Sequence, residues 1–486
     1  MKTFTPEVNS AREFFEIAFD FTASLDVVRE AISNAFDAKA KNISIAFTTK
    51  SEGGEDILYI ALEDDGEGMD GANVKSFFDL GNSSRRDING KPIPGYIGQK
   101  GHGTKTYFNS SRIEVETVKN NEKIIAVMDE PRKNLYNQTI PTYTIETFVC
   151  NDKPGTKILI KGYNNSRCDK FNHDNIVDYI KWKTKMGSIE KEFGISTNTH
   201  VKLKVKGVDK DDFEDLDFGH YFPADSKSPQ VLISKHQTEA PGLYCKKIIK
   251  NGALKSSPQK KWEAIFSIEG SQIKYNYNKM LRRSGYTAPA NSYIIGDRYG
   301  LWLCKDYVPI QQVNEWLGTK GNENTKFHAF LNCQDLRLTA NRSSVDNTPP
   351  EILADLKEEV KKIYEEITSS KDWQDLAELE SQAKGFNTAK AEENDYQRRK
   401  KRVNQARIAD YQGIRLIEPR QESGVYTLYV QLQTIAKLKN KNIFPFVAID
   451  YDTHQGYDVL VKENTALAIK DTVLKFVEFK CFKQRV

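Results

Sequence analysis

The chain has 486 residues, of which 38% are hydrophobic and 28% are charged, and its formal net charge at pH 7 is +4. This balance is typical of globular proteins and leaves room for about three domains at roughly 150 residues each. The sequence shows no apolar run near the roughly 20 residues of a membrane span and no signal-peptide pattern. The six cysteines are scattered, without the paired spacing of metal sites. We therefore expect a cytoplasmic protein without membrane contacts.

The net charge is too small to indicate a nucleic-acid partner by itself, but two basic runs stand out. Residues 246–261 contain six lysines and no acid, and residues 398–402 read RRKKR. Each run has two readings, a solvated loop or helix face, or a surface that contacts phosphate backbones independently of sequence.

The apolar pattern predicts a mixture of helices and strands. Residues 25–40 form an amphipathic helical pattern, and alternating strands follow at 42–47 and 57–64. The polar stretch from Asp70 to about Lys105 has weak periodicity and is expected to be a long loop. Strands are then predicted at 112–118, 123–129 and 155–163, followed by a helix at about 175–190 and a strand-rich region at 200–340. A helix at 351–369 leads into a charged helical connector that reaches about residue 408. The final domain, 411–486, has a predicted helix at about 422–439 and strands.

The helical segment "REAISNAFDAKA" (29–40) carries an unusual polar face. Glu30, Asn34 and Asp37 recur at helical spacing, on a side of their own. The stretch "DDGEGM" (64–69) then follows a predicted strand. Its glycines let the backbone pass close to a flat ligand, and the carboxylate of Asp64 can accept a hydrogen bond from an exocyclic amine such as that of adenine.

A glycine-rich segment, "GYIGQKGHGTK" (95–105), precedes another predicted helix. Gly98, Gly101 and Gly103 leave backbone N–H groups and a helix N-terminus available to phosphates, and Lys105 would add a positive charge. Each of these motifs is weak alone. Their order and spacing together indicate a nucleotide site.

In that order, "EAISNAFDA", "DDGEGM", "IGQKGHG" and "GTKILI" resemble the four motifs of the GHKL ATPases, the superfamily of gyrase, heat-shock chaperones, histidine kinases and MutL. The match covers about residues 25–160, and the glutamate at position 30 favours an ATPase over a kinase. The resemblance implies an α+β protein with a Bergerat-type α/β sandwich. Residues 1–165 would be the ATP-binding domain, with residues 70–103 as its lid.

The resemblance also implies roles for individual residues, with ATP and Mg²⁺ as cofactors. Glu30 would be the general base for the attacking water, and Asn34 would bind magnesium. Asp37 would lie near the base and ribose. Asp64 would read adenine, supported through water by Thr156. The other nucleotide contacts implied are Gly66, Gly68, Met69, Gly98, Gly101, His102, Gly103, Thr104 and Lys105.

Two further segments refine the resemblance. "DLRLTANRSSV" (335–345) is similar to the chaperone loop whose arginine reaches the γ-phosphate, so that Arg342 is either this residue or an ordinary surface arginine. Residues 166–350 would then form an S5-like transducer domain. "FFDLGNSSRR" (77–86) resembles MORC ATPases, which dimerise on ATP binding and act on DNA.

The C-terminal segment contains a second candidate site. Asp458 lies in "GYDVLV", and Glu478 and Lys480 lie two residues apart in "KFVEFK", on one face of a predicted strand. Two carboxylates can hold magnesium and a lysine can polarise a water or a phosphate. The pattern resembles the PD-(D/E)xK nuclease core, with Glu422 as its supporting acid. Residues 351–410 would be a connector and 411–486 a small restriction-endonuclease-like α/β domain. The alternatives are an inactive domain or a surface ion cluster.

These inferences combine into a MORC-like ATPase that forms a homodimer on ATP binding. It would control a magnesium-dependent nuclease-like domain acting on DNA, in defence against phage or other foreign DNA, together with a partner protein of the same system. One alternative is a chaperone-like ATPase that clamps protein clients. Another is an ATP-gated DNA clamp that does not cleave.

Overall fold

The computed structural model describes residues 8–19, 23–81, 96–97, 103–319, 321–339, 342–452 and 459–480. The chain divides into two compact units, Met1–Lys384 and Gly385–Val486, and each is described by itself. Among the described helices, none combines the length and the apolar character needed to cross a membrane.

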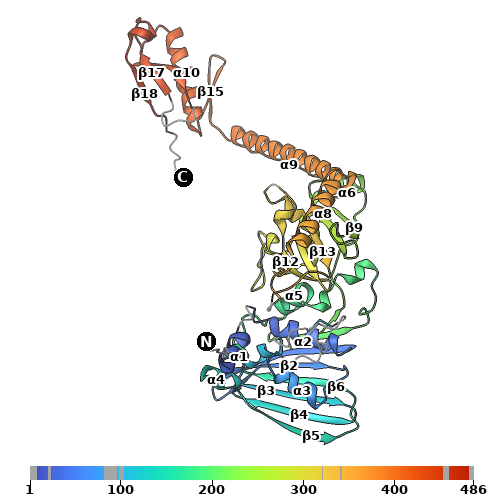
Figure 1. Ribbon diagram of the computed structural model, residues 1–486. Helices are drawn as coiled ribbons and strands as arrows, with labels where there is room; N and C mark the ends of the chain where they lie inside the picture. Colours follow the sequence, from blue (N-terminus) through green and yellow to red (C-terminus); the bar gives the residue numbers. More distant parts are fainter. Residues whose placement is uncertain are drawn as a thin grey trace, which may run out of the picture. The chain divides into compact units, whose positions relative to one another are not determined.

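The first unit begins with an eight-stranded sheet in the order β5-β4-β3-β6-β2-β1-β7-β8. Its strands are β1 (Asn42–Glu52), β2 (Glu55–Asp64), β3 (Arg112–Lys119), β4 (Glu122–Asp129), β5 (Tyr143–Val149), β6 (Gly155–Lys161), β7 (Lys202–Lys206) and β8 (Glu214–Asp217). The helices around it are α1 (Ser10–Phe19), α2 (Asp26–Asp37), α3 (Gly71–Phe78), α4 (Pro131–Tyr136) and α5 (His173–Lys183). Figure 1 shows α2 between this sheet and α5.

The local sequence explains the first hairpin. In β1, Ile43, Ile45 and Phe47 are buried while the residues between them are not, as expected for a strand with one covered face. Glu52 pairs with Glu55, so the turn consists of Gly53 and Gly54, both with positive φ. Two-residue turns of this kind match the twist of the flanking strands, and they favour glycine.

Two features of this first sheet and its connections differ from the sequence-based expectations. The first is the domain boundary expected at residue 165. β7 and β8 lie within the range expected for the second domain, yet β7 pairs in parallel with β1, starting with Asn42 opposite Lys202. The open edge of β1 accepts this strand, and the first sheet therefore continues to Asp217.

The second difference concerns the loop expected from Asp70 to Lys105. It contains a short helix, α3, because the Asp70 side chain caps it by accepting a hydrogen bond from the backbone N–H of Asn73 (2.9 Å). Most of the remainder of the expected lid lies outside the described residues.

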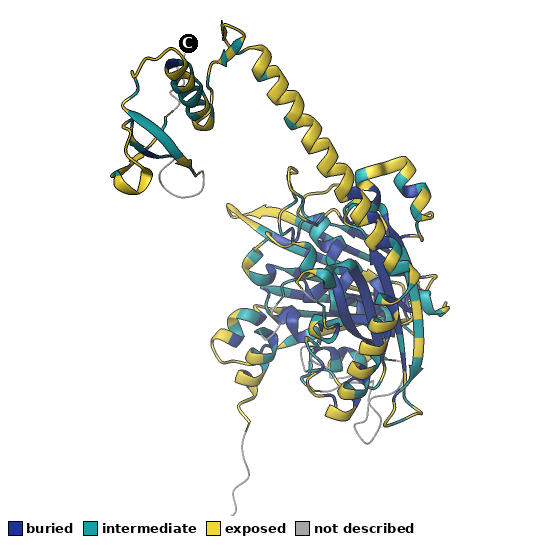
Figure 2. Ribbon diagram, turned by 90° about the horizontal axis from the view of Figure 1, so that it is seen from above, coloured by how far each residue is buried: buried dark blue, intermediate teal, exposed yellow. Residues whose placement is uncertain are grey.

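The second sheet of the first unit has five strands in the order β12-β11-β13-β10-β9. They are β9 (Cys245–Ala253), β10 (Lys261–Glu269), β11 (Gly300–Lys305), β12 (Val308–Gln312) and β13 (Phe327–Cys333). The helices that accompany it are α6 (Pro229–His236), α7 (Ser271–Tyr277), α8 (Pro350–Thr368) and α9 (Lys371–Asn404). β13 is buried at every position, and α8 packs Ile352, Leu356 and Val360 into the same core. Figure 2 shows this buried sheet in dark blue.

Short 3-10 helices connect the larger elements. They are η1 (Gly103–Phe108), η2 (Tyr163–Ser166), η3 (Lys185–Gly187), η4 (Glu190–Phe193), η5 (Gln237–Leu243), η6 (Ile295–Asp297), η7 (Asn314–Trp316), η8 (Glu323–Lys326) and η9 (Ile469–Asp471). Of these, η1 matters most for the site, because it begins at Gly103, within the glycine-rich segment 95–105.

The second unit begins within α9, which Figure 2 shows as exposed along most of its length. Its other elements are β14 (Ile408–Tyr411), β15 (Ile414–Ile417), α10 (Glu422–Leu438), β16 (Phe446–Tyr451), β17 (Val459–Glu463) and β18 (Leu474–Val477). β16, β17 and β18 form an antiparallel sheet beside α10. The predicted helices at 351–369 and 422–439 are confirmed by α8 and α10.

The structure distinguishes the two basic runs. Five of the six lysines in residues 246–261 form ion pairs with acids of the first unit: Lys246 with Asp225, Lys247 with Glu192, Lys250 with Glu366, Lys255 with Glu358 and Lys260 with Asp335. The run at 398–402 lies at the end of α9, where Arg398 and Arg399 share one acid, Asp395. The second run is therefore the better candidate for binding an anionic partner.

Candidate nucleotide-binding site

The polar face predicted for α2 is present. Glu30 and Asp37 are buried and Asn34 is half-buried, while Val28 and Ile32 of the same helix belong to the hydrophobic core. Asp37 lies in the last turn of α2, and its Oδ1 accepts a hydrogen bond from the backbone N–H of Ile97 (2.8 Å). α2 is thus amphipathic with two covered faces, one apolar and one that meets the segment before Gly98.

The carboxylate of Glu30 lies against the backbone of Gly103, where η1 begins. A Cβ atom at position 103 would stand 1.8 Å from Oε2 of Glu30, which is far inside contact distance. The other carboxylate oxygen, Oε1, is 3.4 Å from Nε of Arg29. The first and third sequence motifs therefore meet at Glu30.

A polar cluster behind Glu30 was not identified from the sequence. Arg29 also contacts Oδ1 of Asp26 (3.0 Å), and that oxygen accepts a hydrogen bond from the hydroxyl of Tyr179 on α5 (2.6 Å). The hydroxyl of Tyr107 is fully buried near Glu30 and Asn34. The position of Arg29 next to Glu30 in the sequence could have indicated its contact with that carboxylate. No sequence signal indicated Tyr179, because it lies about 150 residues after Arg29.

Asp64 ends β2 and begins the turn that holds the second motif. Its Oδ1 accepts a hydrogen bond from the backbone N–H of Gly66 (2.9 Å), and burial raises the pKa of its carboxyl to about 6. The turn has no room for side chains at its glycines. A Cβ at Gly66 would lie 2.7 Å from Ala38, and one at Gly68, whose φ is +69°, would lie 2.0 Å from the carbonyl oxygen of Val118.

A group of threonines supports this turn from the neighbouring strands. Thr156 on β6 is directly opposite Asp64 on β2. Its hydroxyl is 3.2 Å from that of Thr117 on β3, which accepts a hydrogen bond from the backbone N–H of Met69 (2.8 Å). Thr156 therefore lies beside Asp64, and its support of Asp64 through water stays a prediction. Thr117 was missed, because its contribution depends on β3 pairing with β6.

Thr104 and Lys105 are placed differently from the expectation. Nζ of Lys105 donates hydrogen bonds to the carbonyl oxygen of Phe77 in α3 (2.8 Å) and to the hydroxyl of Thr104 (3.0 Å), which itself donates to Phe77 (2.7 Å). Lys105 is fully buried, and this burial lowers the pKa of its ammonium to about 7. Both side chains fasten η1 to the last turn of α3, and their contact with phosphates stays a prediction. The other expected members, Gly98, Gly101 and His102, lie outside the described residues.

Arg342 approaches the site from the segment after the second sheet. It has a φ of +59°, and its guanidinium donates a hydrogen bond to the carbonyl oxygen of Ile97 (3.0 Å) and lies 3.6 Å from Asp306. Because the N–H of Ile97 is bonded to Asp37, one residue joins Arg342 to α2. This position is consistent with a role at the site, while the contact with a γ-phosphate stays a prediction.

In the second unit, Glu478 and Lys480 directly follow β18. They form an ion pair of 3.2 Å, and both side chains are more than half exposed. Val477 pairs with Val459, the residue after Asp458, while Asp458 itself lies outside the described residues. Within the described ranges, no group of three or more His, Cys, Asp or Glu side chains is arranged to hold a metal ion.

The comparison with known families agrees with this geometry. Residues 22–156 match the model of a family described as histidine kinase-, DNA gyrase B- and HSP90-like ATPases. The matched range runs from just before α2 to Thr156, and it contains the first three motifs and the start of the fourth. No curated protein matches the chain. The match supports a GHKL-type ATPase domain that binds ATP, as the four motifs predicted.

The close approach of Gly103 to Glu30 generates a first prediction. Gly103→Ala should lower the rate of ATP hydrolysis about tenfold or more, because the added methyl group must push the Glu30 carboxylate from its position. Gly71→Ala is the matched control, since a Cβ at position 71 meets no atom within 4 Å. Steady-state ATPase assays on both variants check this, and equal rates would contradict it.

The environment of Asp64 generates a second prediction, on pH. Above pH 6 its carboxylate can accept the exocyclic amine of ATP, which inosine triphosphate lacks. As the pH falls below about 6 the carboxyl takes up a proton, and the preference for ATP should decline by at most about tenfold per pH unit. Comparing the two dissociation constants between pH 5 and 8 cancels the titration of the phosphates. A constant ratio would show that Asp64 does not read the base.

Proposed function

We propose that the chain hydrolyses ATP with Glu30 as the general base. The observation that carries this proposal is the buried Glu30 carboxylate, held between Arg29 and the backbone of Gly103, inside the segment that matches the ATPase family. A general base must be ionised and must lie within hydrogen-bond reach of the attacking water. Arg29 places its positively charged guanidinium against this carboxylate, with Nε 3.4 Å from Oε1.

The proposed reaction assigns one task to each part of the site. Asp64, with Thr156 beside it, binds the adenine amine, and Asp37 lies near the base and ribose, where it holds the backbone N–H of Ile97. Water attacks the γ-phosphorus, its proton passes to Glu30, and the bond to the β,γ-bridging oxygen breaks to release ADP. Arg342 stabilises the charge that develops on the transferred phosphoryl group.

The donor set on α2 also fits magnesium. Mg²⁺ in nucleotide sites is held by one or two protein oxygens together with phosphates and water. Asn34 supplies one neutral amide oxygen, one helical turn after Glu30, and is half-buried rather than sealed in the core. Bound there, the ion would offset phosphate charge during transfer.

We propose further that two ATP-bound heads dimerise and act on DNA, as in MORC ATPases, in defence against foreign DNA. Support comes from the resemblance of residues 77–86, from the contact of Arg342 with Ile97 at the start of the third motif, and from the basic run 398–402 on α9. A chaperone-like ATPase and a DNA clamp that does not cleave are the competing functions. They share the ATP site and differ in what they bind.

Replacement of the base gives the direct test. Glu30→Ala should bind ATP but hydrolyse it roughly 10²–10⁴ times more slowly, because a positioned proton acceptor is lost. Glu63→Ala serves as the control, since that carboxylate is half-exposed on β2 and pairs with Lys157 at 2.9 Å. Undiminished turnover in Glu30→Ala would remove this residue from the mechanism.

The solution mass of Glu30→Ala should double when ATP is added, and a monomer at micromolar concentration would refute ATP-driven dimerisation.

A second candidate activity, a metal-dependent nuclease, is favoured by one observation in the second unit. The antiparallel pairing of Val459 with Val477 brings the residues next to Asp458 and Glu478 together, and Glu478 already contacts Lys480. A carboxylate pair with a nearby lysine can hold magnesium and polarise a water or a phosphate. The proposal is that the ATPase controls cleavage of DNA at this point.

Plasmid cleavage with magnesium, with and without ATP, tests this activity. Glu478→Ala should abolish cleavage and leave ATP turnover unchanged. Glu463→Ala is the matched control, because Glu463 pairs with Lys475 on the same sheet (3.0 Å). No cleavage by the natural chain with magnesium or manganese would refute the nuclease. Salt-sensitive retention of DNA would then favour the clamp, and its absence the chaperone-like function.

A further inference from the structure

Helix α5 carries two adjacent polar side chains that bind opposite partners within the first unit. Asp178 and Tyr179 project about 100° apart, as neighbours on a helix do. The Tyr179 hydroxyl donates to Asp26 on α2 (2.6 Å), and Asp178 binds residues that precede β11 of the second sheet. α5 is therefore in polar contact with the helix of the ATP site on one side and with the second sheet domain on the other.

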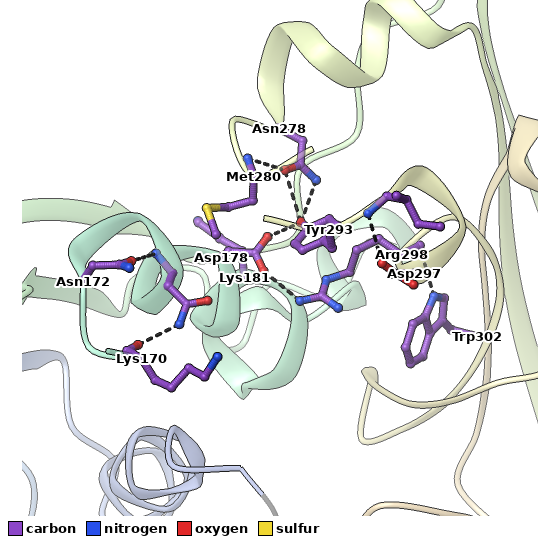
Figure 3. A network of polar contacts seen from close by, with 12 residues as sticks. Lys170, Asn172, Asp178, Lys181, Asn278, Met280, Tyr293, Asp297, Arg298 and Trp302 are labelled. Carbon is purple, nitrogen blue, oxygen red and sulfur yellow. Dashed lines mark hydrogen bonds and ion pairs between the residues drawn. The ribbon is translucent and has the colours of Figure 1, made fainter. Parts of the chain in front are cut away.

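The contacts on the Asp178 side form a dense buried network (Figure 3). Oδ2 of Asp178 accepts from the guanidinium of Arg298 (2.9 Å), and Oδ1 accepts from the hydroxyl of Tyr293. Asn278 donates a further hydrogen bond to Tyr293 (3.0 Å), and Arg298 lies 4.2 Å from the centre of the Tyr293 ring. Asp178 is itself buried. A buried ion pair with several hydrogen bonds tolerates little displacement, because separating its charges leaves them desolvated.

The contacts on the Tyr179 side lead to the catalytic base. Asp26 is buried and receives both the Tyr179 hydroxyl and the guanidinium of Arg29 (3.0 Å), whose Nε is 3.4 Å from Glu30. Arg29 is thus shared between two carboxylates. Removing the Tyr179 hydroxyl leaves Asp26 short of a donor, so that Asp26 competes more strongly for Arg29. Glu30 then loses a donor that fixes its orientation.

We propose that Asp178 and Tyr179 are positioning residues for ATP hydrolysis, which hold α5 between the second sheet domain and α2 and thereby keep Arg29 against Glu30. The proposal rests on Glu30 being the base. Neither residue contacts Asp64 or its glycine turn, so the link acts on turnover and not on nucleotide affinity. It also gives the second sheet domain a route to the base that is separate from Arg342.

The first experiment uses Tyr179→Phe in the full chain. The substitution keeps the ring and removes only the hydroxyl, and it should lower kcat about tenfold while leaving KM and the ATP dissociation constant within about twofold. Tyr244→Phe is the matched control, because it also removes the hydroxyl of a buried tyrosine. The Tyr244 hydroxyl donates to the carbonyl oxygen of Asp372 (2.8 Å), and both residues are far from Arg29 in the sequence. Its kcat should stay within about twofold.

A double-variant cycle tests whether the two sides act through one helix. Asp178→Asn should also lower kcat, and the double variant with Tyr179→Phe should lose clearly less than the product of the two single effects. If the double variant loses kcat by the full product of the two single-variant factors, the two residues act independently and the inference is overturned. It is also overturned if Tyr179→Phe has the same kcat as Tyr244→Phe. Should Tyr179→Phe not fold, Tyr293→Phe applies the same test from the other side.

The outcome separates this inference from the proposed function. If the natural chain does not hydrolyse ATP, or if Glu30→Ala is fully active, the proposed mechanism is wrong. If Glu30→Ala is inactive while Tyr179→Phe and Asp178→Asn turn over normally, the base stands and the positioning link is refuted.

Discussion

The approach of the Glu30 carboxylate to the backbone of Gly103 is the tightest constraint in the site, because even one methyl group at position 103 would overlap it. This contact sets how closely η1 can lie to α2. Further contacts hold η1 and α2 on the sides that face away from each other. Lys105 and Thr104 bind η1 to the last turn of α3, and Gly66 brings the turn after β2 against Ala38, just beyond the end of α2. Glu30, Asp64 and the start of η1 are therefore held by one connected set of contacts.

The second sheet domain reaches this set at two places. Arg342 binds the carbonyl oxygen of Ile97, whose N–H is bonded to Asp37 at the end of α2. α5 binds the beginning of the same helix through Tyr179 and Asp26. The two contacts lie at opposite ends of α2, with Glu30 and Asn34 between them. The second sheet domain therefore contacts both ends of the helix that carries Glu30 and Asn34.

The C-terminal unit has a much smaller buried apolar core than the first unit. Among its described residues only Ala436, Val459 and Val461 are buried apolar side chains, whereas Leu474 and Phe476 on β18 are exposed. Its charged side chains, including Glu478 and Lys480, remain largely in solvent. Exposed ion pairs contribute little to stability, so these charges are available for a ligand at small cost to the fold.

Local sequence patterns were sufficient to predict the parts of the site that lie close together along the chain. The helical spacing of Glu30, Asn34 and Asp37 required a shared face, and the acid and glycines after β2 required a tight turn. The motif order then indicated the GHKL ATPase family that residues 22–156 match. These features depend on geometry that repeats within a few residues, which a sequence shows directly.

Contacts between distant segments were decided only by the tertiary structure. Lys105 was predicted from its local motif to meet phosphate, whereas its hydrogen bond to the carbonyl oxygen of Phe77 in α3 became visible only in the fold. β7 joined the first sheet because β1 had an open edge, a pairing that no local pattern encodes. Thr117 and Tyr179 entered the site through strand pairing and helix packing across long stretches of chain. The sequence by itself determined which groups can do the chemistry; packing determined which of them are placed to do it, because a side chain's partners depend on the whole fold and not on its neighbours in the chain.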